Sequence, residues 1–115
     1  MIYVIDDDEI MAGCIARAIS GTVKVFSNAI EAMSEISNGE IPDLIFLDIL
    51  LDGPDGFTFL NELVSYDDTA KIPIVVVSSL KFDESQLGVY GVVGVLSKEK
   101  MRPEDIRRYE DEYAK

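Results

Sequence analysis

The sequence predicts an α/β fold in which a parallel β-sheet is covered by helices on both faces. Short apolar segments alternate five times with segments of helical spacing, and strands that alternate with helices in this way form parallel sheets. Several apolar segments are continuous runs of Val and Ile, as expected for strands buried on both faces. No internal repeat or linker-like stretch divides the chain, so we expect residues 1–115 to form a single domain.

The expected strands are the short apolar runs, each followed by a polar turn. In a parallel sheet their carboxyl ends lie at one edge, where α/β proteins bind their ligands. The runs are residues 2–5, 22–26, 44–47, 74–77 and 92–96.

The segments between these runs have the spacing of amphipathic helices. In the first, the pairs Ile10/Cys14 and Ile15/Ile19 predict an inward face and a packed Cys14 thiol. A fourth helix at 83–90 is short and contains Gly88. The second helix has Asn28 and Glu31 as a capping pair, and the last starts near Pro103 with Glu110, Asp111 and Glu112 facing out. The other expected inward residues are Ile30, Met33 and Ile36; Phe57, Leu60, and Leu63 or Val64; and Ile106, Tyr109 and Tyr113.

The composition excludes several classes of function. The 22 Asp and Glu residues against 10 Lys and Arg residues give a net charge of −12, which disfavours binding to nucleic acid or to anionic membranes. Without histidine, the chain has no Ser-His or Cys-His catalysis, no usual zinc site and no histidine phosphotransfer. No apolar run is long enough to span a membrane, and an apolar segment directly after Met1 leaves no room for a signal peptide. We therefore expect a cytoplasmic protein.

Polar residues follow most of the expected strands. Asp6, Asp7 and Asp8 follow the first strand, Asp48 the third, Ser78 and Ser79 the fourth, and Ser97 and Lys98 the fifth. Each residue taken alone is explained by turn or cap chemistry; Asp8 in particular has the position of a helix N-cap. Because the strand ends converge on one edge of the sheet, their joint occurrence predicts a functional site.

The residue types in this set predict the chemistry of the site. Crowded carboxylates repel one another unless a cation neutralises them, and oxygen ligands without His or Cys favour Mg²⁺. Lys98 adds a positive charge and Ser78 a hydroxyl donor. With these groups one carboxylate, most simply Asp48, can accept a phosphoryl group and form an acyl phosphate.

The chain resembles the response regulator receiver domains of two-component signalling over essentially its whole length, in particular single-domain, chemotaxis-regulator-like receivers. This resemblance implies a flavodoxin-like (βα)5 doubly wound sandwich with strand order 2-1-3-4-5. The segments that carry it are Ile-Tyr-Val-Ile-Asp-Asp-Asp at 2–8, Pro-Asp-Leu-Ile-Phe-Leu-Asp at 42–48, Asp-Gly-Phe at 55–57, Ile-Pro-Ile-Val-Val-Val-Ser at 72–78 and Gly91 through Lys98.

The resemblance implies a role for each matching residue. Asp48 is the phosphoacceptor, Ser78 the switch hydroxyl, and Lys98 the cation that pairs with the phosphoryl group. The expected Mg²⁺ ligands are Asp7, Asp6 (partly through water), Asp48 and the main-chain carbonyl of Leu50.

The chain departs from the family pattern at several positions. Val95 replaces the aromatic residue that turns inward in many receivers, and Glu99 replaces the proline after the lysine, so we expect a trans bond there. Asp52 replaces the usual proline of the acceptor loop, and the fourth helix is about two residues shorter than usual. Leu50 and Leu80 are apolar, which predicts slow self-dephosphorylation because they exclude water.

The implied function is a phosphorylation-switched receiver that takes its phosphoryl group from a histidine kinase or a histidine phosphotransfer protein. It is not an enzyme apart from its self-catalysed phosphorylation and slow dephosphorylation. Its output passes through the face of the fourth helix, fifth strand and fifth helix to a separate protein, or to an effector domain beyond residue 115. An alternative is a receiver that binds partners without being phosphorylated.

Two other classes that share parts of this pattern fit less well. A haloacid dehalogenase phosphatase requires a second Asp two residues after the nucleophile, where this chain has Leu50. A flavodoxin requires a phosphate-binding loop after the first strand. The three aspartates at 6–8 would repel the flavin phosphate there.

Overall fold

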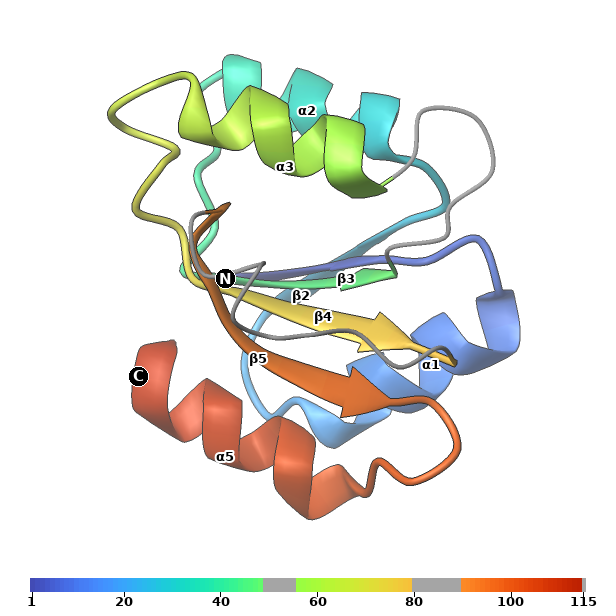
Figure 1. Cartoon of the computed structure of the whole chain (residues 1–115). Helices are drawn as coiled ribbons and strands as arrows, with labels where there is room; N and C mark the ends of the chain where they lie inside the picture. The colour runs from blue at the N-terminus through green and yellow to red at the C-terminus, as the bar shows by residue number, and fades with distance from the viewer. Residues whose placement is uncertain (49–55, 80–89, 115) are drawn as a thin grey trace.

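The computed structural model describes residues 1–48, 56–79 and 90–114, without the side chains of residues 56 and 57. In this part of the chain five strands form one parallel sheet in the order β2-β1-β3-β4-β5 (Figure 1). The expected parallel sheet and its 2-1-3-4-5 order are therefore confirmed. The strands are β1 (Ile2–Ile5), β2 (Val23–Phe26), β3 (Leu44–Asp48), β4 (Ile74–Ser78) and β5 (Val92–Ser97).

Helices cover both faces of this sheet. Figure 1 shows α2 and α3 on one face and α1 and α5 on the other. Residues 83–89 of the expected fourth helix lie outside the described residues. The described helices are α1 (Glu9–Ala18), α2 (Ala29–Ser37), α3 (Gly56–Val64) and α5 (Pro103–Tyr113).

The sheet separates two hydrophobic cores. Successive strand residues point to opposite faces, so Tyr3 and Ile5 pack under α2 and α3, whereas Ile2 and Val4 pack against α1 and α5. The same alternation in β3 and β4 explains why these strands are buried along their whole length. Burial on both faces accounts for the continuous apolar runs in the sequence.

Helix α1 confirms the prediction for Ile15 and Ile19, which are both buried, but not for the Ile10/Cys14 pair. Its N-cap is Asp8, whose side chain accepts hydrogen bonds from the N–H groups of Ile10 and Met11. The buried residues are Ala12, Ile15 and Ala18, while Ile10 is 80% exposed and Cys14 is also exposed. The prediction of a packed thiol is wrong, because the small Ala side chains allow that face, rather than the Ile10/Cys14 face, to lie against the sheet.

Helix α2 confirms the prediction for Ile36, which is buried, and for Met33, which packs partly buried against the core, but not for Ile30. Asn28 caps it as expected by accepting a hydrogen bond from the N–H of Glu31 at 2.9 Å. Its buried residues are Ala29, Ala32 and Ile36, and Ile30 is 63% exposed. Ile30 was wrongly predicted to face the core, because the two alanines occupy the side nearest the sheet and leave Ile30 on the outer side.

Helix α3 packs as predicted at Leu60 and Leu63, which are both buried. Phe59 is buried as well and joins the same core. The predicted contribution of Phe57 lies outside the described side chains. Together these residues fix α3 over the face of the sheet that contains Tyr3 and Ile5.

Helix α5 contains a buried carboxylate that the sequence pattern missed. Ile106 is buried as predicted, but Glu110, expected to face solvent, is only 3% exposed. Its carboxylate accepts hydrogen bonds from the Ser20 N–H, the Ser20 hydroxyl and the Gly21 N–H at 2.8–3.1 Å. These donors at the end of α1 explain the correction, because they satisfy the buried charge.

Candidate functional site

Three carboxylates meet at the carboxyl edge of the sheet. Asp6 and Asp7 directly follow β1, and Asp48 is the last residue of β3. Strands β1 and β3 pair with Ile5 opposite Leu47, which places Asp6 beside Asp48. One oxygen atom from each of the three carboxylates lies within 4.8 Å of the others. The sequence prediction that these residues converge is confirmed.

The three carboxylates differ in their access to solvent. Asp6 is 2% exposed and Asp48 is 4% exposed, whereas Asp7 is exposed. Burying a carboxylate is unfavourable unless opposite charge or hydrogen bonds compensate for its lost hydration. The cluster therefore concentrates negative charge on two buried carboxylates. Solvent contacts the cluster at the exposed side chain of Asp7.

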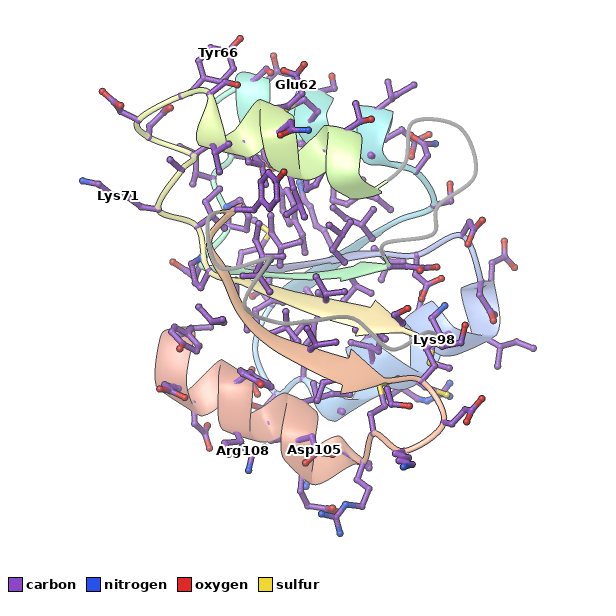
Figure 2. All side chains as sticks on the ribbon, in the orientation of Figure 1. Glu62, Tyr66, Lys71, Lys98, Asp105 and Arg108 are labelled. Carbon is purple, nitrogen blue, oxygen red and sulfur yellow. The ribbon has the colours of Figure 1, made fainter. Side chains whose placement is uncertain are left out.

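Lys98 provides positive charge at this site. It follows β5, and Figure 2 shows it at the carboxyl ends of β4 and β5. Its Nζ atom lies 3.1 Å from Asp48 Oδ2 and 3.3 Å from Asp6 Oδ2. Burial alone would lower the pKa of Lys98, but its hydrogen bond to Asp48 and the charges of both aspartates raise the pKa above its ordinary value. The lysine is therefore protonated at neutral pH.

The backbone around Lys98 holds its side chain in place. The N–H of Lys98 donates a hydrogen bond to the carbonyl oxygen of Ser78 at 2.9 Å, which ties the end of β5 to the end of β4. The bond between Lys98 and Glu99 is trans, as expected. The loop thus positions the ammonium group without the proline that is usual in the family.

Asp6 is held in two different ways by its two oxygen atoms. Oδ1 accepts a hydrogen bond from the N–H of Asp8 at 2.9 Å, whereas buried Oδ2 accepts no hydrogen bond from any described residue. Burial, together with the nearby charge of Asp48, raises the pKa of Asp6 to about 6, against the opposing effects of the Asp8 N–H and Lys98. The ammonium group of Lys98, 3.3 Å away, is therefore the positive charge that faces this buried oxygen atom.

Ser78 is the buried last residue of β4, with 1% of its surface exposed. Asp48 is paired with Val77 in the adjacent strand, so Ser78 lies one position beyond the aspartate at the same edge. Val95, which replaces the aromatic residue that turns inward in many receivers, is partly buried against the core beneath α2 and α3. Leu50, Asp52 and Leu80 lie outside the described residues.

Every described residue of this site was predicted from the sequence, but one contact between two of them was not. The direct approach of Lys98 to Asp6 was not foreseen, because Lys98 was expected to pair with a phosphoryl group. The crowding of Asp6 and Asp48 is the signal that predicts it, since two buried carboxylates attract the nearest cation.

Comparison with known proteins identifies the family. The family model described as the response regulator receiver domain matches residues 2–109. The chain belongs to this family. Receiver domains typically bind Mg²⁺ at an acidic pocket, and this receiver domain has an acidic cluster of Asp6, Asp7 and Asp48.

Curated relatives share part of the sequence. The receiver domain is 31% identical over 74 residues to the sensor histidine kinase CheAY of Helicobacter pylori, covering 64% of this chain and 9% of that protein. It is 28% identical over 81 residues to the response regulator PleD of Caulobacter vibrioides, covering 69% of this chain and 18% of that protein. The chain thus spans less than a fifth of the length of either relative.

A solved structure confirms the fold. The receiver domain of NtrX from Brucella abortus superimposes with a TM-score of 0.82 at 22% identity, covering 97% of this chain and 96% of that one. This similarity extends over β1 to α5 and includes the strand order. It shows that the receiver fold is present along essentially the whole chain.

The residues at the site are suited to a divalent cation. Their donors are carboxylate oxygens only, which is the set that a hard cation such as Mg²⁺ prefers. Asp6 Oδ2 has no hydrogen bond from a described residue, and the pKa of Asp6 is raised by burial and by Asp48. Both features are those of a carboxylate that a nearby cation would stabilise in its ionised form.

Proposed function

We propose that this receiver domain accepts a phosphoryl group on Asp48. The observation that supports the proposal is the position of the Asp48 carboxylate, between an acidic pair and a lysine. Its Oδ2 atom lies 3.1 Å from Lys98 Nζ, and one of its two oxygens lies within 4.8 Å of an oxygen of Asp6 and of Asp7. The carboxylates that can bind a metal ion and the ammonium group that can bind a phosphoryl group therefore both lie next to the nucleophile.

The carboxylates of Asp6, Asp7 and Asp48 would hold Mg²⁺, with the Leu50 carbonyl as a further ligand outside the described residues. When bound, the ion supplies positive charge that offsets the phosphoryl oxygens. Lys98 and Ser78 supply the remaining contacts. The ammonium group would exchange its carboxylate partner for a phosphoryl oxygen, and the serine hydroxyl would donate a hydrogen bond to another.

The transfer step uses one oxygen of Asp48 as the nucleophile. This oxygen attacks phosphorus as the bond between phosphorus and a histidine nitrogen of the donor breaks, and an acyl phosphate forms. Because these 115 residues contain no histidine, the donor histidine lies outside them, in a histidine kinase or a histidine phosphotransfer protein. The domain acts on no other substrate in this proposal, and its acyl phosphate hydrolyses slowly.

Phosphorylation would switch the domain through charge. It adds about −1.5 to −2 charges at Asp48, and Ser78 and Lys98 would move toward the new oxygens. Their strands lead to the surface around β5 and α5, which would present the signal to a downstream protein or to an attached effector domain in the cytoplasm. Val95 has no ring, so the signal travels without aromatic rotation.

The decisive experiment is incubation with Mg²⁺ and acetyl phosphate, followed by intact-mass measurement. The wild type should gain the mass of one phosphoryl group, and Asp48→Asn should gain none. Asp67→Asn, which changes an exposed aspartate remote from the cluster in sequence, is the matched control and should behave as the wild type. If none of the proteins is modified, the domain is instead an interaction module that works without phosphorylation.

A further inference from the structure

A shallow groove, apolar at one end and mixed in polarity at the other, lies between the outer sides of α2 and α3, and neither the aspartate cluster nor Lys98 contributes to it. It consists of two adjoining hollows of about 460 and 370 Å³. Both hollows are lined by Met33, Ser37 and Glu62, so they form one continuous surface, which we call the α2–α3 groove. Ile30 and Phe59 line one end, and Tyr66 and Asp68 line the other.

Large apolar side chains remain exposed at both ends of the α2–α3 groove. Ile30 is 63% exposed and Tyr66 is 58% exposed. Figure 2 shows Tyr66 and Glu62 on the outer side of the helical layer, at a distance from Lys98. Covering such side chains removes apolar surface from water, which favours association. Apolar surface is therefore exposed to water at both ends of the groove.

The segments that form the groove carry acidic side chains, although Lys24 of β2 pairs with Glu35 and Lys71 follows directly in the sequence. Residues 29–37 and 56–70 carry five carboxylates and no Lys or Arg. Of the carboxylates, Glu35 is paired with Lys24 at 3.7 Å, and Glu62 and Asp68 line the groove itself. The sequence positions of the five are Glu31, Glu35, Glu62, Asp67 and Asp68. An apolar channel with an acidic border is complementary to an apolar segment flanked by cations.

We propose that the α2–α3 groove binds a cationic amphipathic helix of a partner protein. Apolar residues spaced one and two turns apart on that helix would contact Ile30, Met33 and Tyr66. Its Lys or Arg residues would lie against Glu62 and Asp68. Two turns of partner helix span about 11 Å, close to the length of a nine-residue helix such as α3, about 13 Å. A second copy of this chain is a poorer occupant, because each copy carries a net charge of −12.

The groove can be tested with a designed helical peptide of Leu and Lys in amphipathic order, labelled with fluorescein. Fluorescence anisotropy should show binding to the receiver domain. Binding should be at least about tenfold weaker for a peptide of the same composition in scrambled order, and absent for a Leu/Glu amphipathic peptide. Equal binding of the ordered and scrambled peptides would reduce the effect to net charge and overturn the proposal.

Paired variants locate the binding surface. Ile30→Ser and Glu62→Gln should each weaken binding about fivefold or more. Their matched controls, Ile10→Ser on α1 and Glu112→Gln on α5, change similarly exposed residues elsewhere and should bind as the wild type. Tyr66→Ser gives an independent test should Ile30→Ser fail to fold. Equal weakening by the controls would contradict the proposal.

Sedimentation of the free domain tests whether a second copy of this chain, and not a partner helix, occupies the groove. A dimer that forms at high protein concentration and is lost in Ile30→Ser would show that a second copy fills the groove, and would overturn the proposal. A monomer at all concentrations supports it. Because neither measurement uses phosphodonor or Mg²⁺, failure of the phosphoryl-acceptor proposal would leave both results unaffected.

Discussion

Asp48 and Lys98 meet across the end of a strand to which neither belongs. Asp48 ends β3 and Lys98 follows β5, and both strands pair with β4 between them. Their side chains nevertheless form an ion pair of 3.1 Å. The same ammonium group lies 3.3 Å from Asp6, so it faces two buried carboxylates. The stability of the site therefore depends on the balance of these charges.

The free energy of unfolding should fall as pH rises from 4 to 6 in the absence of divalent cations. The pKa of folded Asp6 is about 6, above the unfolded value of about 3.9. Between these values the folded state binds the additional proton, so raising the pH favours unfolding. The loss should approach about 3 kcal/mol at most. Urea unfolding in EDTA should show this loss in the wild type and in Asp67→Asn but not in Asp6→Asn; identical slopes for all three would contradict the assignment.

Asp7 and Asp8 are adjacent, but mutating them should have different effects: one on the Mg²⁺ response and the other on stability. Asp8 caps α1 through the N–H groups of Ile10 and Met11, so Asp8→Ala should lower the free energy of unfolding by about 1 kcal/mol. Asp7→Asn should leave that cap intact but reduce the rise in melting temperature caused by Mg²⁺. Thermal unfolding with and without Mg²⁺ measures both effects. A Mg²⁺ response that Asp8→Ala abolishes and Asp7→Asn preserves would reverse the two roles.

Gly94→Ala should destabilise the domain through Tyr109. A methyl group on Gly94 would overlap the Tyr109 phenol, so the ring would have to leave its site on β5, at a cost of about 1–3 kcal/mol. In a Tyr109→Ala background the same change should be stabilising by up to about 1 kcal/mol, because alanine restricts the unfolded strand more than glycine does. A double-mutant cycle by urea unfolding measures the coupling. Additive effects would show that the ring is not the obstacle.

Glu110→Ala should destabilise the domain more than a surface change on the same helix. It removes the charged acceptor for the N–H groups of Ser20 and Gly21, and a hydrogen bond to a charged group contributes about 1.5–3 kcal/mol. Glu110→Gln retains one acceptor oxygen, so its free energy of unfolding should fall by less than that of Glu110→Ala. Glu112→Gln, on the exposed side, is the control and should be neutral. Equal stability of Glu110→Ala and the control in urea unfolding would refute this role.

The sheet and its functional edge could be predicted because they depend on local patterns. Continuous Val and Ile runs mark strands buried on both sides, and polar residues after them mark the ligand edge. Asp6, Asp7, Asp48, Ser78 and Lys98 therefore appear in the sequence at the right strand ends. Their contact distances depend on strand register and could not be read from residue types.

The buried faces of the helices were less predictable, because small and polar residues determine which face packs against the sheet. In α1 and α2 the alanines at 12, 18, 29 and 32 lie nearest the sheet, but alanine contributes little to an apolar pattern. Ile10, Cys14 and Ile30 were consequently expected on the wrong side. The burial of Glu110 depends on donors from Ser20, ninety positions away, and no helical pattern can contain that partner.

The position of Lys98 late in the chain has a consequence for biosynthesis. Strands β1, β2 and β3 all lie within the first 48 residues, so a nascent chain can bring Asp6, Asp7 and Asp48 together long before position 98 has been translated. Until β5 is added, this cluster lacks the lysine that balances it, and contacts over such separations form slowly. The three carboxylates therefore repel one another in the growing chain until Lys98 is in place.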